Sequence, residues 1–122
     1  MAKTLTIDDG VRKIGEYAFA SCGWMRKSMG AVSVPASVSE IGAGAFASCT
    51  MTSLTVNGNG ECLIGSRAFS GCGSLETAVI GDGIVGIGER AFEMSPALKT
   101  VTIGNGVKSI GKEAFFRSGL LY

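Results

Sequence analysis

The chain has 122 residues, of which 46% are hydrophobic and 17% charged, so it has the composition of one globular domain with an apolar core. Its formal net charge is only +1, which argues against nucleic-acid binding, because such proteins usually carry a strongly basic surface. No apolar run has the length of a transmembrane helix, and residues 1–15 lack the apolar block of a secretory signal peptide. We therefore expect no nucleic-acid partner and no insertion into a membrane.

A short strand is predicted at the start of each unit of the chain. Apolar residues alternate with small or hydroxylated ones in five segments, which is the pattern of a strand with one buried face: 4–7, 31–34, 53–56, 77–80 and 100–103. A turn rich in Gly, Asn or Asp follows, because Gly and Asn accept a positive φ without strain. The next two apolar residues, Val107 and Ile110 in the last unit, are three positions apart, which predicts one helical or 3₁₀ turn on the outer side.

The phrase Ile-Gly-x-x-Ala-Phe closes each unit and occurs five times. It begins at Ile14, Ile41, Ile64, Ile87 and Ile110. The spacings are 41−14 = 27 and then three steps of 23 residues. A fixed period in this range indicates a solenoid, in which each repeat buries its apolar face against its neighbours. We predict an α/β solenoid of about five 23-residue repeats, with one short parallel sheet on one face, short helical turns on the other, and the Ile and Phe side chains in continuous buried columns.

Two breaks interrupt this period. The first step is four residues longer than the others, and we place the insertion at Trp24, Met25, Arg26 and Lys27. Insertions in repeat proteins often lie on the binding face, and Trp and Arg are enriched in binding hot spots, so these four are candidate binding residues. The alternative is a loop whose Trp folds back over the core. The second break is a longer turn at residues 57–62, after a strand whose apolar residues come one position early.

The predicted strands also define two exposed rows of small, mostly hydroxylated residues. One row is Thr4, Ala31, Ser53, Thr77 and Thr100, and the other is Thr6, Ser33, Thr55, Val79 and Thr102. Thr is common in strands whatever their function, so the rows fit an ordinary solvated sheet face. They also fit a flat docking surface, and on that interpretation the candidate binding residues are Ser33, Thr55, Val79 and Thr102.

No catalytic, cofactor or metal site is predicted. The chain has no His, which is the commonest general base, and no Cys-x-x-Cys pair of the kind that binds zinc. Three Cys lie three residues after the repeat Phe, and Ser takes this position in the last two repeats: Cys22, Cys49, Cys72, Ser95 and Ser118. We interpret this series as a column of small buried residues, the alternative being a disulfide between repeats. Cys62, in the longer turn, is either a core residue or a partly exposed thiol.

Residues 32–49 resemble, position by position, the BspA-like class of leucine-rich repeats, whose units run L-x-x-I-x-I-P-x-x-V-x-x-I-G-x-x-A-F-x-x-C. The resemblance covers almost the whole chain, with Gly81 and Gly104 where the class usually has Pro. It implies a non-enzymatic protein-binding or adhesion module of a surface or secreted protein, with a partner on a host or neighbouring cell. The alternative is an intracellular interaction scaffold, which the absence of a signal peptide and the unpaired cysteines favour.

The two ends of the chain look abrupt, so residues 1–122 are expected to form one solenoid domain that is a fragment of a longer repeat array. Solenoids need capped ends, and the last residues of the chain are apolar. We expect a partner chain, further repeats or an end-to-end homo-oligomer to cover this end. The residues involved are Phe116, Leu120, Leu121 and Tyr122.

Overall fold

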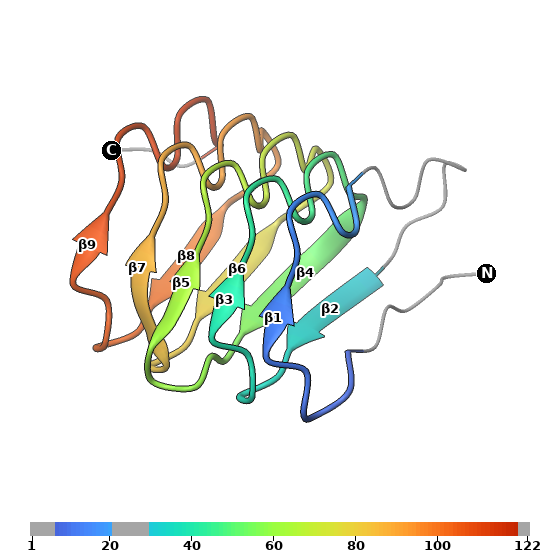
Figure 1. The fold of residues 1–122 in the computed structure, drawn as a ribbon. Helices are drawn as coiled ribbons and strands as arrows, with labels where there is room; N and C mark the ends of the chain where they lie inside the picture. Colours follow the sequence, from blue (N-terminus) through green and yellow to red (C-terminus); the bar gives the residue numbers. More distant parts are fainter. Residues whose placement is uncertain (1–6, 21–29, 120–122) are drawn as a thin grey trace.

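The protein is a solenoid of parallel strands in two sheets (Figure 1). Its structure, a computed structural model, describes residues 7–20 and 30–119. The four-stranded sheet, in spatial order, consists of β2 (Gly30–Val34), β4 (Met51–Val56), β6 (Thr77–Ile80) and β8 (Thr100–Ile103). The five-stranded sheet consists of β1 (Lys13–Ile14), β3 (Glu40–Ile41), β5 (Cys62–Ile64), β7 (Ile84–Ile87) and β9 (Ser109–Ile110). Successive turns of the chain add their strands side by side.

The alternation in the sequence sets which side of the four-stranded sheet is buried. In β6, Ala78 and Ile80 point into the core while Thr77 and Val79 are exposed, as a period of two requires. Equivalent residues are paired across the sheet: Val32 with Leu54, Leu54 with Ala78, and Ala78 with Val101. The predicted strands at 31–34, 53–56, 77–80 and 100–103 are confirmed.

The prediction of a single sheet backed by short helical turns is wrong. The second residue of each apolar pair, such as Ile110, lies in a strand of a second parallel sheet, in which Ile87 pairs with Ile110. The described residues contain no α- or 3₁₀-helix. The turns that join this sheet to the next repeat hold residues with φ near +60° at two places, as at Arg90 (+56°) and Met94 (+60°). A right-handed helix excludes such residues, so each outer segment is a compact coil of turns.

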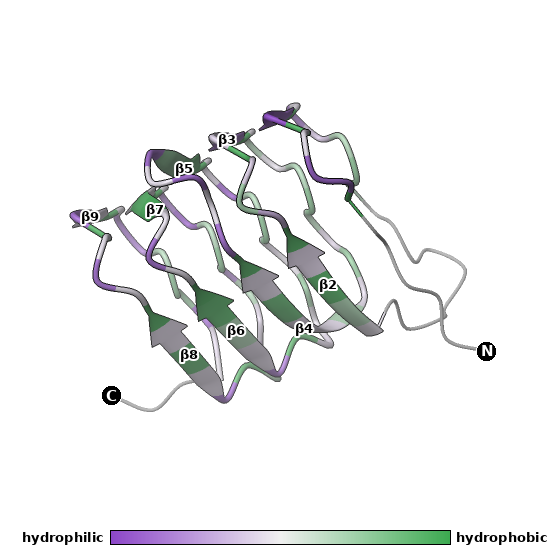
Figure 2. Cartoon of the chain, turned by 90° about the horizontal axis from the view of Figure 1, so that it is seen from below, coloured by the Kyte–Doolittle hydropathy of each residue, from purple (hydrophilic) through white to green (hydrophobic). Residues whose placement is uncertain are grey.

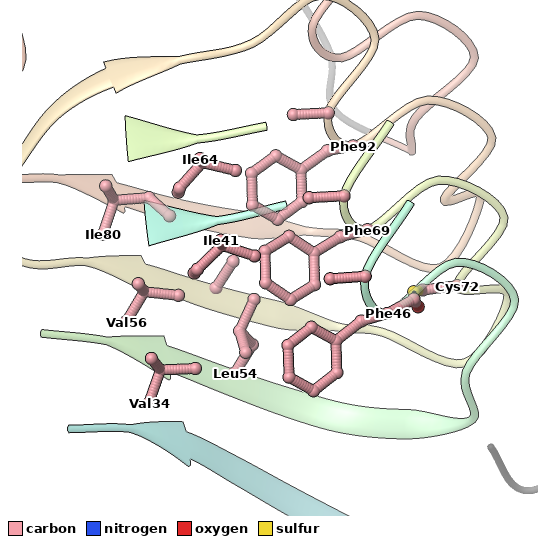
Figure 3. Close-up of a cluster of buried hydrophobic side chains, with 14 of the residues drawn as sticks. Val34, Ile41, Phe46, Leu54, Val56, Ile64, Phe69, Cys72, Ile80 and Phe92 are labelled. Atoms are coloured by element: carbon pink, nitrogen blue, oxygen red, sulfur yellow. The ribbon is translucent and has the colours of Figure 1, made fainter. Parts of the chain in front are cut away.

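The predicted columns of buried Phe and Ile side chains are confirmed (Figure 3). Stacked rings of the repeat Phe run through the solenoid with centroids 5.1, 5.1, 5.2 and 5.3 Å apart: Phe19, Phe46, Phe69, Phe92 and Phe115. The three central rings have no exposed surface. The repeat Ile form a parallel column beside them, buried from Ile14 to Ile87. Each repeat therefore obtains its core by stacking on its neighbours.

The Gly of the phrase allows this close stacking. A Cβ atom added to Gly65 would lie 2.6 Å from the Ile41 carbonyl oxygen of the preceding repeat, and one added to Gly88 would lie 2.7 Å from the Gly65 carbonyl carbon. These neighbours are backbone atoms that cannot move aside without shifting the whole repeat. Any other residue would separate the repeats.

The irregular second repeat keeps the register of the four-stranded sheet from Ser53 to Val56, after a register shift between Gly30 and Ala31 of β2. Leu54 still pairs with Ala78, although it comes one position early in the sequence. The extra residues are taken up by the turn that precedes β5 and by a register shift between Cys62 and Leu63. The other break, the insertion at 24–27, lies outside the described residues.

Removal of one ring from the middle of the Phe column should be costly. We expect Phe69→Ala to lower the free energy of unfolding by about 3–5 kcal/mol, because the fully buried ring leaves a cavity between two rigid neighbours. Phe116→Ala, which removes a ring that is 41% exposed, should cost about 1 kcal/mol or less in dilute solution. Urea unfolding followed by circular dichroism measures both, and equal losses would refute the role of the column.

Candidate interaction surface

The predicted row of exposed strand residues is continuous across the four-stranded sheet. Ser33 pairs with Thr55, Thr55 with Val79, and Val79 with Thr102. Ser33, Thr55 and Val79 lie on the outward face, since each has buried neighbours on both sides along its strand. Thr102 pairs with Val79 and continues the row on β8. The structure thus brings the four candidate residues together in one line, and their role in binding stays a prediction.

The second row lies beside the first in the same register. Ala31 pairs with Ser53, Ser53 with Thr77, and Thr77 with Thr100. Figure 2 shows the four strands side by side, with strongly hydrophobic bands alternating with weakly polar ones along each strand. We call the eight residues of the two rows the strand face; Thr4 and Thr6, which were expected to extend it, lie outside the described residues.

The strand face is flat and uncharged. Its eight side chains are all small, and six of them carry a hydroxyl group. Adjacent strands in a sheet are about 4.8 Å apart, so successive side chains in each row are evenly spaced. The largest apolar group is Val79, at the third strand, which is 39% exposed. Such a face offers hydrogen-bond donors and acceptors at a low cost in side-chain entropy, because short side chains lose little freedom on binding.

A network of ion pairs joins the outer turns of the last three repeats. Arg90 Nη2 lies 2.7 Å from Glu113 Oε1, and Arg90 Nη1 lies 3.3 Å from Glu93 Oε2. Arg67 Nε is 3.8 Å from the other oxygen of Glu93, to which Ser70 Oγ also donates a hydrogen bond. The hydrogen bond to Glu113 and the charge of that residue raise the pKa of Arg90. Because these charges are paired with one another, the network ties successive repeats together and offers little charge to a ligand.

The sequence analysis did not predict this network, because it did not pair charged residues of successive repeats. The usable signal is the 23-residue period itself, since Arg90 and Glu113 occupy the same position in consecutive repeats. Residues one period apart are neighbours in a solenoid, as residues four apart are on a helix.

The cysteine column is confirmed for the described members. Cys49 Sγ donates a hydrogen bond to the Phe19 carbonyl oxygen at 3.0 Å, and Cys72 Sγ donates to that of Phe46 at 3.3 Å. Cys62 is a buried core residue beside Ile84. Cys62 and Cys72 are free thiols, and Cys22 lies outside the described residues.

The buried thiols are held in their neutral form. Burial raises the pKa of Cys72 to about 11. Burial and the negative charge of Glu40 raise the pKa of Cys62 to about 11 as well. The thiolate is the nucleophilic form of cysteine, so both groups are structural rather than reactive.

Ser95 continues the cysteine column but does not repeat its hydrogen bond. Its side chain has no exposed surface, and its Oγ atom has no hydrogen-bond partner in the part of the chain that the structure describes. A buried hydroxyl without a partner costs about 1–3 kcal/mol, whereas a thiol is much easier to bury. The fourth repeat is therefore less stable than the two before it at this position.

No cluster of three or more His, Cys, Asp or Glu side chains able to hold a metal ion occurs in residues 7–20 and 30–119. The same residues include no helix long and apolar enough to cross a membrane. The insertion residues Trp24, Met25, Arg26 and Lys27 lie in the undescribed segment 21–29, so the structure does not place them relative to the strand face.

Comparison with known proteins agrees with the solenoid fold and the repeated phrase. The family model described as BspA type leucine rich repeat region (6 copies) matches residues 2–121. The chain belongs to this family. This family model comprises six copies of the repeat, one more than the five repeats expected from the phrase.

A solved structure shares the fold of this BspA-type chain. It is the crystal structure of a leucine-rich repeat protein from Bacteroides ovatus ATCC 8483, which matches with a TM-score of 0.55 and 21% sequence identity. The match covers 97% of this chain but only 36% of that protein, so the chain spans about a third of its length. No curated protein gave a significant match.

Replacing Ser95 by Cys should stabilise the protein. We expect Ser95→Cys to raise the free energy of unfolding by about 1 kcal/mol, because it removes an unpaired buried hydroxyl and supplies the thiol used in the preceding repeats. The matched reverse change, Cys72→Ser, should lower it. Urea unfolding under reducing conditions measures both, and a loss of stability in Ser95→Cys would contradict this interpretation.

Proposed function

We propose that this domain is a non-enzymatic protein-binding module and that its docking surface is the strand face. The main support is the alignment of the eight outward-facing residues into two continuous rows that contain no charged residue. Membership of the leucine-rich repeat family supports a role in protein interaction in general. The Ile, Ala and Phe of the phrase face the core in the central repeats, so these side chains are not available to a partner.

The partner is best described as a protein surface that is itself fairly flat. The strand face is a stiff platform, because each of its strands is fixed by hydrogen bonds to its neighbours and by a buried core beneath. Short hydroxyl groups form hydrogen bonds worth about 0.5–1.5 kcal/mol each, so affinity builds up over several strands. Val79 supplies an apolar centre among them, which fits the apolar core and polar rim of protein interfaces.

We further propose that the domain is displayed on a cell surface or secreted, where it adheres to a protein of a host or neighbouring cell. BspA-type leucine-rich repeats are commonly surface-associated, and this is the basis of the assignment. An intracellular interaction scaffold is the second candidate. It is favoured by the buried free thiols of Cys62 and Cys72, since disulfides are common in extracellular proteins and rare in the reducing cytosol.

Substituting the centre of the strand face should weaken binding without affecting the fold. We expect Val79→Lys to weaken binding at least about tenfold, because a charged side chain would be buried at the centre of the interface. Leu63→Lys is a matched control, since Leu63 is 53% exposed on the other sheet. Surface plasmon resonance over immobilised extracellular-matrix proteins, and pull-down from cell lysate, compare the two. Equal binding by both variants, with unchanged melting temperatures, would refute the assignment of the strand face.

The insertion is tested in the same assay. Trp24→Ala combined with Arg26→Ala should weaken binding while leaving the melting temperature nearly unchanged, if these side chains contact the partner. A large fall in melting temperature would instead show that Trp24 covers the core.

A further inference from the structure

All three asparagines of the chain are followed directly by glycine: Asn57, Asn59 and Asn105. In such a dipeptide the backbone nitrogen of glycine can attack the side-chain amide carbon of asparagine, because glycine has no side chain to block the approach and adopts the backbone angles that the attack requires. The same dipeptide occurs here in three different settings. Differences in reactivity among the three therefore come from the fold.

Asn57 is held against the preceding repeat. Its backbone N–H and its side-chain Nδ2 both donate to the Val34 carbonyl oxygen, at 3.0 and 3.1 Å. The next residue, Gly58, is buried, and a Cβ atom added to it would lie 2.7 Å from the Gly83 carbonyl oxygen. Neither the side-chain amide of Asn57 nor the backbone nitrogen of Gly58 can therefore rotate without disturbing an adjacent repeat.

Asn105 is exposed, but the backbone around it is fixed. Its N–H donates to Asp82 Oδ1 at 2.8 Å. A Cβ atom added to Gly106 would overlap the Asp82 carbonyl oxygen, so this glycine lies directly against the preceding repeat. An attack on Asn105 requires rotation of the peptide group that joins it to Gly106, and this contact opposes the rotation.

Asn59 lies in the longer turn before β5, where the backbone is open. Asn59, Gly60 and Glu61 are all exposed. Apart from the chain neighbours of Gly60, no atom of the described residues lies within 4 Å of the place that a Cβ atom would take on this glycine. The peptide group between Asn59 and Gly60 therefore has room to rotate, unlike those that follow Asn57 and Asn105.

Two hydrogen bonds set the reactivity of Asn59. Glu61 N–H donates to Asn59 Oδ1 at 2.9 Å, which is an Asx turn. Negative charge develops on this oxygen as a nitrogen adds to the amide carbon, so the N–H group stabilises the transition state. Gly60 N–H donates to the Gly83 carbonyl oxygen at 3.0 Å, and this bond must open before the attack. The same oxygen also accepts from Cys62 N–H at 3.1 Å, so the opening leaves it paired.

We propose that Asn59 is a modification site, at which the folded protein deamidates spontaneously. Gly60 N forms a bond to Asn59 Cγ and the Cγ–Nδ2 bond breaks. The side-chain nitrogen leaves as ammonia, taking the proton lost from Gly60 N, and a cyclic imide remains. Water then opens the ring at Cγ, which gives aspartate, or at the backbone carbonyl carbon of residue 59, which gives isoaspartate. Water is the only co-reactant.

The products change the charge of the turn that leads into β5. A carboxylate at position 59 lies two residues from Glu61 and lowers the formal net charge from +1 to 0, since 11 Lys and Arg then face 11 Asp and Glu. Isoaspartate also adds one carbon to the backbone, which the open turn has room for. The site lies off the strand face, so it is independent of the proposed docking surface.

Peptide mapping by tandem mass spectrometry tests this proposal during incubation of the folded protein at neutral pH. We expect Asn59 to deamidate at least about fivefold faster than Asn57 and Asn105, which is the effect of one typical hydrogen bond. In urea the three rates should become similar, because unfolding removes the contacts that distinguish them. The proposal would be overturned if Asn59 reacted no faster than the other two in the folded protein, or if the same order of rates persisted in urea.

Glu61→Pro tests the contribution of the Asx turn. Proline has no N–H, so this change removes the donor to Asn59 Oδ1 and should slow deamidation of Asn59 about fivefold. Glu61→Gln keeps the N–H and is the matched control, which should react at close to the original rate. Circular dichroism and an unchanged rate at Asn105 verify that each variant is folded. Equal rates at Asn59 in the two variants would refute the contribution of this hydrogen bond.

Discussion

Successive repeats of this protein are held at a backbone separation that leaves no room for a side chain on the phrase Gly. The Ile-Gly hydrogen bond of 2.7 Å and the ring spacing of 5.1–5.3 Å recur at every step. A Cβ atom at Gly65 or Gly88 would meet backbone atoms of the preceding repeat. Register, core and sheet follow from this contact, because a shift of one repeat against the next would misplace the Phe rings, the Ile column and both ladders of strands together.

This contact also decides where function is found. The Ile, Gly, Ala and Phe of the phrase serve the core and the contact between repeats, and the thiols of Cys49, Cys62 and Cys72 are buried as well. The outward-facing residues are those of the strand face and of the outer turns, where the variable positions of the phrase carry the paired Arg90 and Glu113. Of these surfaces, we propose the uncharged, regularly spaced strand face as the docking surface.

The strands of the four-stranded sheet were predictable from sequence because the alternation of buried and exposed residues has one structural meaning there. The second sheet was not, since two apolar residues three positions apart, such as Val107 and Ile110, fit a helical turn as well as an extended segment. The positive φ angles that exclude the helix fall on residues such as Arg67 and Arg90, which rarely adopt them, so composition gave no warning. The strand face was located from sequence, whereas the ion pairs of Glu93 became visible only when successive repeats were placed side by side.

If stacking stabilises each repeat, its stability must depend on the number of neighbouring repeats. Two equivalent hydrogen bonds, one in a central turn and one in the last turn, allow this dependence to be measured. The amide of Gly88, in a central turn, donates to Ile64, and that of Gly111, in the last turn, donates to Ile87, both at 2.7 Å. Native-state hydrogen exchange in dilute solution compares them. If each repeat is held by stacking on both sides, the Gly88 amide exchanges only through global unfolding and the Gly111 amide exchanges faster, by local fraying. Equal rates at the two positions would show that the turns are stable individually and would contradict the dependence of the fold on contacts between repeats.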